Sequence, residues 1–495
     1  MEKNNVDEYE IRKQKLESLK ENEIVYKDKF NCTAQLCDVA IKPDGEAVSV
    51  AGRVVSKRSF GKFMFINLYD ANGTAQISAD KNDLGDNFEL FKKNVDIGDF
   101  IGVTGEIYTT GTGVKTVKTL EGSLLSKAVR PLPEKFHGIT DSDAKYRQRY
   151  LGIISSKETR DTFKKRVIIL NSIKEYLRSN DFLEVETPIL QNVASGANAR
   201  PFITKHNALD EDFYLRIAPE LYLKQVVESG FNRVFEMGKN FRNEGMDASH
   251  LQEFTMLEWY AAYWDYLQNM SFLEKMLKDI ISNVNGGLEV EYQGQVFDFN
   301  NFSKINYSDT ISSLLNTDIL DFDDVEKVKK LFRDNQLFSE KEIDSIKSVT
   351  AAVDLLFKKK VRPYLTQPTI LYNYPAYMIP LARRNDLDPR VIDMFQLVIN
   401  GWEMSKCYSE LIDPQIQRKT FEQQMIDKHN GDEESMSIDE DFILAMEHGM
   451  PPMSGLGLGI DRLVSLLTNE PTLRDVILFP QMKRINRNGN SRGVK

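Results

Sequence analysis

The stretch VFEMGKNFRNEGMDASHLQEFTMLEWY, residues 234–260, decides the fold. Two alternating runs, 234–241 and 253–260, flank a polar segment, which predicts an antiparallel strand pair joined by a long loop. Alternation places Asn240 and Arg242 on one face, and Phe254, Glu258 and Tyr260 on one face of the partner strand. An arginine, an aromatic ring and a carboxylate together can bind a phosphate, a base and a cation. From this segment alone, a surface cluster of ion pairs is the favoured interpretation.

A second pattern is GLGLGIDRL at residues 455–463, where glycines alternate with apolar residues. Alternate glycines leave one strand face bare, and a bare face usually marks the close approach of a ligand or another backbone. Arg462 lies near the start of the helical pattern 463–467, where its charge adds to the field of the helix N-terminus and favours a phosphate. A glycine strip that only allows tight packing is an equally good interpretation. The sequence contains no P-loop and no G-x-G-x-x-G motif.

A third pattern runs from residue 395 to 410, where an apolar run, 395–399, leads into Glu403 and Glu410. Two carboxylates near a candidate phosphate site suggest Mg²⁺, which prefers one or two carboxylates together with phosphate oxygens. Two glutamates at this separation are also common by chance, so this pattern is weak evidence by itself.

The N-terminal part changes to a period of two at residue 47. Short β-rich runs at 48–55, 63–68, 75–78 and 100–104 are broken by a helix-like segment, 88–93, and Asn72-Gly73 is typical of a hairpin turn. This pattern predicts a small closed barrel or, equally, a small β-sandwich. Residues 1–30 predict a largely exposed helix with few apolar positions.

The rest of the chain begins with a long helix. Ser155 and Glu158 have the spacing of a capping box, and one apolar stripe is expected at Phe163, Val167, Leu170, Ile173 and Leu177. Beyond Pro188 strand-like and helical patterns alternate without a regular βαβ repeat. The acidic stretch 308–360 predicts an insertion of surface helices, and the polar tail, 482–495, is expected to be disordered.

Composition limits the class of protein. The chain has 495 residues, of which 41% are hydrophobic and 28% charged, so it is globular and long enough for about three domains. A net charge of −10 argues against a protein that coats nucleic acid non-specifically. No stretch is apolar enough to span a membrane, and the charged N-terminus predicts no secretory signal. The three cysteines cannot form a disulfide framework, which favours a cytoplasmic protein.

Together the three patterns resemble motifs 2 and 3 and the metal-binding strand of class II aminoacyl-tRNA synthetases. The closer resemblance is to lysyl-tRNA synthetases of subclass IIb, of bacterial type, and it extends from about Glu8 to Pro480. Further matching segments are RPLPEKFHG at 130–138, YRQRYL at 146–151, ARPF at 199–202, HNAL at 206–209, LRIAPELYLK at 215–224 and PLAR at 380–383. The 155–180 helix with EVETP at 184–188 would form motif 1.

The resemblance implies an α+β multidomain fold: an N-terminal OB-fold β-barrel, followed by a class II catalytic domain with an antiparallel sheet flanked by helices. We expect a helical extension at 1–45, the anticodon-binding OB-fold at 46–130, a linker at 131–150 and the catalytic domain at 151–495. The implied partners are ATP, L-lysine, tRNA(Lys) and a second copy of the chain, joined through motif 1 around Pro188. No DNA and no membrane are expected as partners.

The resemblance also implies roles for individual residues. Arg242 would hold the ATP α-phosphate and the lysine carboxylate, and Arg462 the γ-phosphate; these two are the expected catalytic residues. ATP would also be bound by Glu244 at the adenine, Phe254 stacked on it, His250, Glu403 and Gly459. The lysine pocket would consist of Gly196, Glu220, Glu258, Tyr260 and Glu410, and among these Glu410 is expected to meet the ε-ammonium most directly. Phe65 and Gln76 would contact anticodon bases, and Gln396 and Glu403 would bind Mg²⁺ as cofactor.

Four positions depart from the family pattern. Ser249 replaces an arginine that touches the γ-phosphate, and Gln396 replaces the first metal carboxylate. Lys406 replaces an asparagine near the substrate carboxylate, and Val114 replaces a glutamate of the barrel. These departures bear on the number of metal ions and on anticodon recognition.

The implied reaction is ATP-dependent activation of lysine to lysyl-adenylate, followed by transfer to the 3′ end of tRNA(Lys). It needs alignment and charge neutralisation and no protein nucleophile. An aspartyl- or asparaginyl-tRNA synthetase of the same subclass is the alternative enzyme. A non-catalytic RNA-binding paralogue and a ligase that modifies a protein are further alternatives. Retention of Arg242, Arg462 and Glu403 disfavours the first of these two, and the N-terminal barrel disfavours the second.

Overall fold

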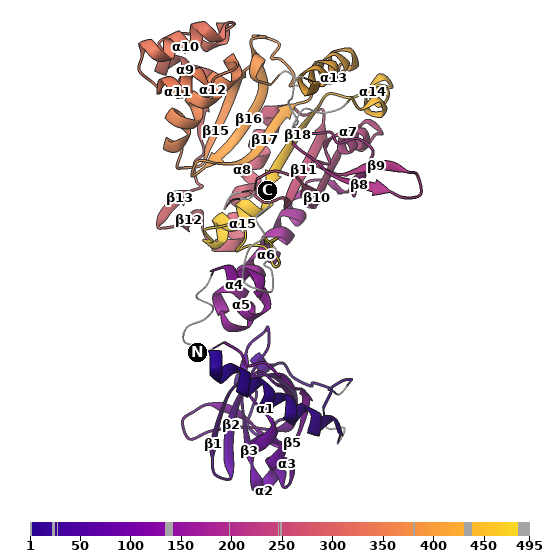
Figure 1. The fold of residues 1–495 in the computed structure, drawn as a ribbon, viewed down its shortest axis with the longest axis vertical. Coiled ribbons are helices and arrows are strands. Elements are labelled where there is room, and N and C mark those ends of the chain that lie inside the picture. Colours follow the sequence, from indigo (N-terminus) through magenta and orange to yellow (C-terminus); the bar gives the residue numbers. More distant parts are fainter. Residues whose placement is uncertain are drawn as a thin grey trace. The chain divides into compact units, whose positions relative to one another are not determined.

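The structure is a computed structural model that describes residues 2–21, 25–26, 28–133, 142–197, 199–245, 247, 250–379, 382–429 and 438–483 (Figure 1). Almost all of the tail expected at 482–495 and part of the expected linker lie outside these residues. The chain divides into two compact units, residues 1–160 and 161–495, and the division falls inside a long helix. Each unit is described separately.

The N-terminal unit is a five-stranded closed barrel with the strand order β1-β2-β3-β5-β4. Its elements are α1 (Glu2–Glu21), η1 (Leu36–Ala40), β1 (Ala47–Phe60), β2 (Phe63–Tyr69), β3 (Thr74–Asp80), α2 (Lys81–Leu84), α3 (Asn87–Glu89), η2 (Leu90–Asn94), β4 (Phe100–Thr109), β5 (Lys115–Ser126), α4 (Ser142–Arg147) and α5 (Arg149–Ser155). The barrel, rather than a sandwich, is therefore the correct prediction, and Asn72-Gly73 lies in the predicted β2–β3 hairpin.

Alternation along the barrel strands separates an apolar interior from an outer polar face. In β2, Met64, Ile66 and Leu68 are fully buried, whereas the residues between them are half-buried on the outside. The predicted helix α1 packs on the barrel through Leu19, which is buried in the barrel core. Arg12 of α1 donates to the carbonyl oxygens of Ile97 and Ala128, so the helix is held by polar contacts as well.

The C-terminal unit contains an eight-stranded sheet with the order β14-β15-β16-β17-β18-β11-β10-β6, in which the central pairs are antiparallel. Two further sheets have the orders β7-β9-β8 and β12-β13. The strands of this unit are β6 (Leu183–Glu184), β7 (Leu190–Gln191), β8 (Phe202–His206), β9 (Glu211–Leu215), β10 (Arg233–Phe241), β11 (Glu253–Ala262), β12 (Glu289–Tyr292), β13 (Gln295–Asp298), β14 (Ser303–Asn306), β15 (Thr369–Pro375), β16 (Val391–Ile399), β17 (Trp402–Ser409) and β18 (Met453–Gly459). The predicted antiparallel pair 234–241 and 253–260 is present in the eight-stranded sheet as β10 and β11, of which β10 adjoins the edge strand β6.

Helices and helical turns surround the sheet. They are α6 (Lys157–Ser179), α7 (Glu220–Glu228), α8 (Tyr266–Asn285), α9 (Tyr307–Leu315), η3 (Ile319–Asp321), α10 (Val325–Asp334), α11 (Glu340–Asp344), α12 (Val349–Leu356), η4 (Phe357–Val361), η5 (Arg362–Tyr364), η6 (Ala376–Met378), α13 (Pro414–His429), α14 (Glu440–Glu447) and α15 (Ile460–Thr468). Within the described residues, none of these helices has the length and apolar character needed to cross a membrane.

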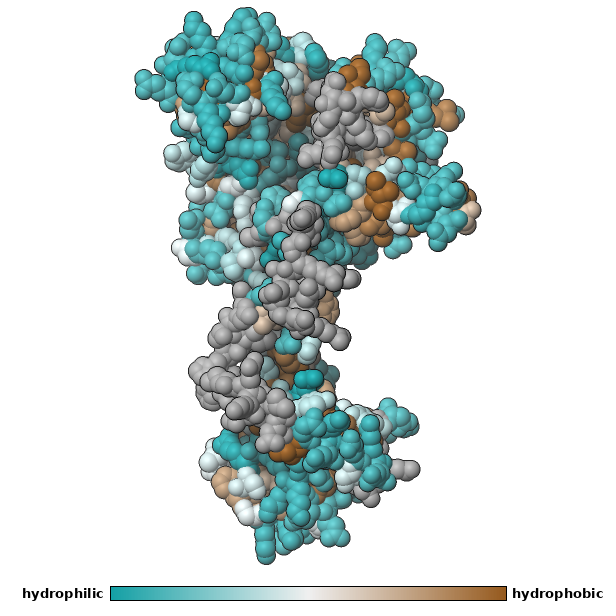
Figure 2. All heavy atoms as spheres, in the orientation of Figure 1, coloured by the Kyte–Doolittle hydropathy of each residue, from teal (hydrophilic) through white to brown (hydrophobic). Residues whose placement is uncertain are grey.

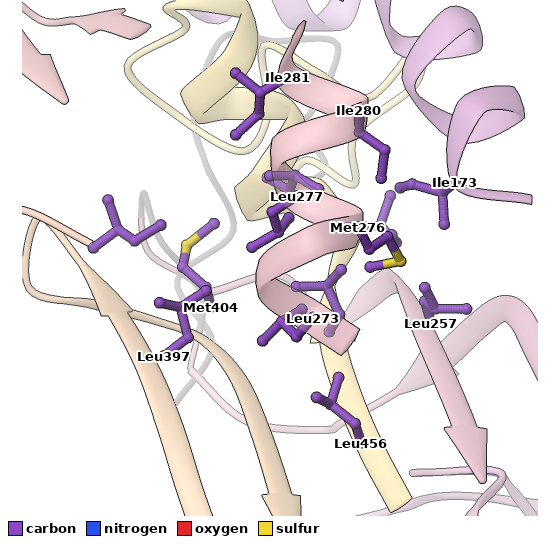
Figure 3. Packing of buried hydrophobic residues seen from close by; sticks show 14 of the residues in the cluster. Ile173, Leu257, Leu273, Met276, Leu277, Ile280, Ile281, Leu397, Met404 and Leu456 are labelled. Atoms are coloured by element: carbon purple, nitrogen blue, oxygen red, sulfur yellow. The ribbon is translucent and has the colours of Figure 1, made fainter. Parts of the chain in front are cut away.

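The main core lies between α8 and one face of the sheet. Figure 3 shows Leu273, Met276 and Leu277 of α8 among side chains from α6 and the central strands. Leu456 and Leu458 of β18 and Ile460 of α15 belong to the same cluster, as the alternation of glycine and apolar residues predicted. The opposite face of the central strands is thus left for the site.

A chain of buried hydrogen bonds ties α8 to the strands. The indole nitrogen of Trp259 donates to Asn269 Oδ1 at 2.7 Å, and Asn269 Nδ2 donates to the hydroxyl of Ser454 at 2.8 Å. The Ser454 hydroxyl in turn donates to the carbonyl of Tyr408 at 2.6 Å. The chain therefore connects α8 with β11, β18 and β17 through polar groups that are otherwise shut off from water.

The long helix α6 differs in detail from its prediction. It begins at Lys157, and the Ser156 hydroxyl accepts from the backbone N–H of Thr159, so Ser155 is not the cap. Ser155 belongs to α5, where its hydroxyl donates to the carbonyl of Leu151. The buried stripe is Ile169, Ile173 and Leu177, whereas Val167, predicted to be in the stripe, is 57% exposed. A residue placed two positions from Ile169 points about 200° away from it on a helix.

The helices expected at 308–360 are present as α9 to α12 and surround their own apolar cluster, which includes Ile311, Phe332 and Val353. Hydrophilic residues dominate the surface of this segment in Figure 2. The expected insertion therefore folds as helices with one buried face and one polar face.

Candidate active site

On the face of the sheet turned away from the α8 core, here called the site face, β11 and β18 run side by side. Glu258 pairs with Gly457 and Tyr260 with Gly455, so the bare face of the glycine strip adjoins the polar face of β11. A Cβ atom at Gly455 would overlap the ring of Tyr260 and the carboxylate of Glu410. The glycines are therefore required for side chains of the neighbouring elements to occupy this space.

Three carboxylates converge on this face around one lysine. The Lys224 ammonium lies 2.6 Å from the Glu220 carboxylate and 2.7 Å from that of Glu410. Tyr260 donates to Glu258 at 3.3 Å, and Glu258, Tyr260 and Glu410 are each at most 6% exposed. Three carboxyl groups and one ammonium therefore lie close together on this face.

Burial changes the proton affinity of these acids. Loss of solvent, aided by the nearby Glu220, raises the pKa of Glu258 to about 8. Burial also raises the pKa of Glu410 to about 7, although Lys224 opposes the shift. For Lys224, burial lowers the pKa but the two carboxylates more than compensate, so its pKa lies above the usual value. Two acids that titrate near neutral pH are thus poised to ionise when a cation enters.

Gly196 borders the carboxylates, and its backbone has a φ of 88°, in the region that favours glycine. A Cβ atom there would come within 3.1 Å of Glu220 Cβ and 3.3 Å of Ala218 Cβ. The residue thus lies beside the start of α7, with the other residues predicted to line the pocket.

Arg242 follows β10 and lies against Phe254, with its guanidinium carbon 5.1 Å from the ring centre. The Arg242 Nε and the Asn240 Oδ1 atoms are buried and make no hydrogen bond within the described residues. Buried polar groups rarely remain unpaired, so both atoms point to a ligand that supplies the missing partners. Asn240 pairs with Phe254, which confirms that these residues share a face.

The loop after Arg242 is described only in part. Glu244 is exposed, and its carbonyl accepts from the Gln252 side chain at 3.0 Å. The exposed imidazole of His250 lies 2.9 Å from Asp247. Ser249, one of the departures from the family pattern, lies outside the described residues.

Arg462 is the third residue of α15, and one guanidinium nitrogen donates to the Glu403 carbonyl at 2.5 Å. Burial lowers the pKa of Arg462, and the Glu403 carboxylate opposes this shift. Gly459 ends β18 directly before the helix. The predicted strand-to-helix junction and its arginine are therefore confirmed.

Gln396 of β16 and Glu403 of β17 are in contact with each other. The Gln396 amide nitrogen donates to the Glu403 carboxylate at 3.0 Å, and its oxygen accepts from the Tyr374 hydroxyl at 2.6 Å. No group of three or more potential metal-binding histidines, cysteines or acids occurs in the part of the chain that the structure describes. The groups here that could bind a metal ion are one carboxylate and one amide oxygen. This set suits a cation that completes its coordination shell with water and phosphate oxygens.

In the barrel, Phe65 and Gln76 occupy the outer face of β2 and β3. Both are half-buried, and Asn67, two residues after Phe65, pairs with Gln76. Gln76 Oε1 accepts from the Thr116 hydroxyl at 2.9 Å, which leaves its amide nitrogen as a donor. Val114 is 44% exposed. An aromatic ring and an amide on an outer barrel face suit contacts to unstacked bases.

Comparison with known proteins identifies both units. A family model described as tRNA synthetases class II (D, K and N) matches residues 141–483, and a model of the OB-fold nucleic acid binding domain matches 48–124. A lysine–tRNA ligase of Enterobacter sp. (strain 638) is 43% identical over 493 residues, covering 97% of each chain. The ligase of Enterococcus faecalis is 42% identical over 96% of this chain and 97% of its own. That of Aquifex aeolicus is 44% identical over 89% of this chain and 74% of its own.

The chain belongs to the lysine–tRNA ligase family of class II tRNA synthetases.

Two cations of this synthetase have a place in the site that its sequence patterns did not predict. Lys224 lies four residues after Glu220 on the same face of α7, so the i, i+4 spacing is a signal that could have indicated their contact. The position of Lys406 on the site face depends on a local irregularity of β17, which a period-two pattern cannot predict.

Proposed function

We propose that the side chains on the site face form the site at which this chain activates L-lysine with ATP, before transfer to tRNA(Lys). The observation that carries the proposal is the set of three carboxylates around a single lysine beside the glycine strip. A substrate ammonium brought out of water needs fixed negative charge. An acidic substrate such as aspartate would be repelled by the same groups.

The phosphate end of the site would be formed by Arg242 and Arg462. The unpaired Nε of Arg242 and the nearby ring of Phe254 support binding of a phosphate and an adenine base respectively. In the proposed reaction, a carboxylate oxygen of lysine attacks the α-phosphorus, and the bond to the bridging oxygen breaks to release pyrophosphate. The 3′-terminal ribose hydroxyl of the tRNA then attacks the carbonyl carbon, and AMP leaves.

Glu403, with Gln396, would hold Mg²⁺ as cofactor. When bound, the ion neutralises phosphate charge and orients the leaving pyrophosphate. The protein groups themselves align the two substrates, and no nucleophilic side chain is required.

The other proposed partners follow from separate features. Phe65 and Gln76 on the outer barrel face support anticodon binding. A second copy of the chain is supported by an apolar cavity of about 360 Å³ beside the exposed Ile189, lined by Leu190, Phe202, Ile203, Thr204, Lys205, His206, Phe213 and Leu215. The free cysteines Cys32, Cys37 and Cys407 support a cytoplasmic location.

Pyrophosphate exchange measured with each of the twenty amino acids tests the proposal. We expect exchange with lysine alone, and Glu410→Gln should reduce it through the lysine KM while ATP binding stays nearly unchanged. Exchange with aspartate or asparagine and not with lysine would reject the pocket assignment. Absence of exchange with every amino acid, together with intact RNA binding, would favour a non-catalytic role.

A further inference from the structure

Strand β17 carries a bulge at Met404. Val398 of β16 pairs with Glu403 and the preceding Leu397 pairs with Ser405, so Met404 has no partner of its own. In a regular strand, residues three positions apart face opposite sides of the sheet. A bulge adds one residue, so residues three apart that span it face the same side. Met404 and Cys407 accordingly lie in the core, and Glu403 and Lys406 both lie on the site face.

Lys406 lies in the middle of a row across the sheet. It pairs with Gln396 on one side and with Gly457 on the other, and Gly457 pairs in turn with Glu258. Gly457 contributes no side chain to this row. The half-buried lysine is therefore placed between the end of the site that holds Glu403 and the end that holds the carboxylate pocket.

The ammonium of Lys406 has the Tyr408 side chain as its hydrogen-bond partner and no paired carboxylate among the described residues. It lies 5.4 Å from the ring centre of Tyr408. Burial lowers the pKa of Lys406, but Tyr408, Glu403 and Glu220 together raise it above its usual value, so the group is a cation at neutral pH. Its register partner Gln396 is neutral and already hydrogen-bonded to Tyr374 and Glu403. A half-buried cation without a paired anion favours an incoming oxyanion.

We propose that Lys406 binds a substrate oxyanion directly, at the junction between Glu403 and the carboxylate pocket. This inference rests on the proposed function, because that junction is where the carboxylate of the amino acid must meet the α-phosphate of ATP. The oxyanion is one of these two groups. Lys406 thus supplies a fixed positive charge from the protein itself. The neutral Gln396, in contrast, adds no charge that would help to hold a metal ion.

Equilibrium binding without metal separates the two oxyanions. Isothermal titration in EDTA would measure the Kd of L-lysine, lysinamide and ATP for the wild-type protein, Lys406→Met and Lys406→Arg. If the oxyanion is the carboxylate, Lys406→Met should weaken lysine about tenfold or more, as loss of a charge-assisted contact implies, and leave lysinamide unchanged. If it is the phosphate, ATP should weaken instead. Lys406→Arg should keep part of the affinity.

The control is Lys347→Met, which removes an exposed lysine of the helical insertion. Lysine and ATP affinities within twofold of wild type in Lys406→Met would overturn the inference. A wild-type protein that does not bind lysine would instead reject the proposed function, and the ATP titration would still test Lys406. Should Lys406→Met fail to fold in a thermal melt, Lys406→Gln keeps hydrogen bonding while removing the charge.

Discussion

The ammonium of Lys224 lies 2.7 Å from the carboxylate of Glu410, and both side chains are almost completely buried. The pocket proposed to bind a cation therefore contains one already. Lys224 offsets part of the charge of the carboxylates, so that Glu220 and Glu410 are not unpaired acids.

Lys224→Met should lower the melting temperature, because removing one partner of a buried ion pair costs about 3–5 kcal/mol. The decrease in melting temperature relative to the wild-type protein should be larger at pH 8 than at pH 5.5. Lys224 lowers the pKa of Glu410, so without it Glu410 takes up a proton more readily and becomes neutral at the lower pH. Thermal melts of both proteins across this range measure the difference. A deficit that grows as the pH falls would contradict this assignment.

Lysine affinity should improve as the pH rises from 6 to 8. Glu258 has a pKa of about 8 in the free protein, so at lower pH its carboxyl group must lose a proton before it can pair with an ammonium. Release of one proton changes the Kd by up to about tenfold per pH unit. Titration in two buffers of different ionisation enthalpy would count the protons released. Glu258→Gln should reduce both the slope and the proton count, and an affinity that improves towards pH 6 would reject the role of Glu258.

Arg242→Lys should remain badly impaired in pyrophosphate exchange. An ammonium cannot reproduce the planar fork of a guanidinium, and the lost stabilisation of the transition state should be about 2–4 kcal/mol. Arg418→Lys serves as the matched control, because Arg418 forms an exposed ion pair with Glu440. Near-normal exchange by the Arg242 variant would exclude a bidentate phosphate contact.

Glu403→Ala should abolish adenylate formation, whereas Gln396→Ala should reduce it less. The Gln396 oxygen is already engaged by Tyr374, which leaves the carboxylate as the main protein ligand for Mg²⁺. Exchange rates measured over a range of Mg²⁺ concentrations separate loss of metal affinity from loss of turnover. Equal losses in the two variants would show that this ranking is wrong.

Gly455→Ala should weaken lysine binding while leaving ATP binding near normal. The added methyl group would collide with Tyr260 and Glu410, and relief requires one of these side chains to leave the pocket. Gly287→Ala is the control, since a Cβ atom there meets nothing within 4 Å. Binding titrations of lysine and ATP provide the measurement, and unchanged lysine affinity would mean that the pocket tolerates the methyl group.

Period-two alternation predicted part of the eight-stranded sheet well. It identified β10 and β11, the face shared by Glu258 and Tyr260, and the bare face of the glycine strip. These predictions succeeded because a regular strand has only two faces. The proposed roles of the site residues came from resemblance, and alternation only made their grouping plausible.

Alternation could not predict irregular geometry. The bulge at Met404 changes which residues of β17 lie on the site face, and no local feature of the sequence predicts it. In α6, the predicted stripe includes Val167 although Ile169 is the buried residue, because residues 167–170 are all apolar and do not fix which of them faces the core. Side chains that meet across elements, such as Tyr374 with Gln396, depend on the strand order of the sheet.

The hydrogen-bond chain from Trp259 through Asn269 to Ser454 has a consequence for evolution of the chain. A shift of α8 along the sheet by one turn would leave an indole, an amide and a hydroxyl without partners in a dry interior. Apolar residues of α8 can exchange with others of similar volume, but these polar positions can change only together. Substitutions of Trp259, Asn269 and Ser454 should therefore have non-additive effects on stability. During evolution these three positions should change more slowly than the apolar residues around them.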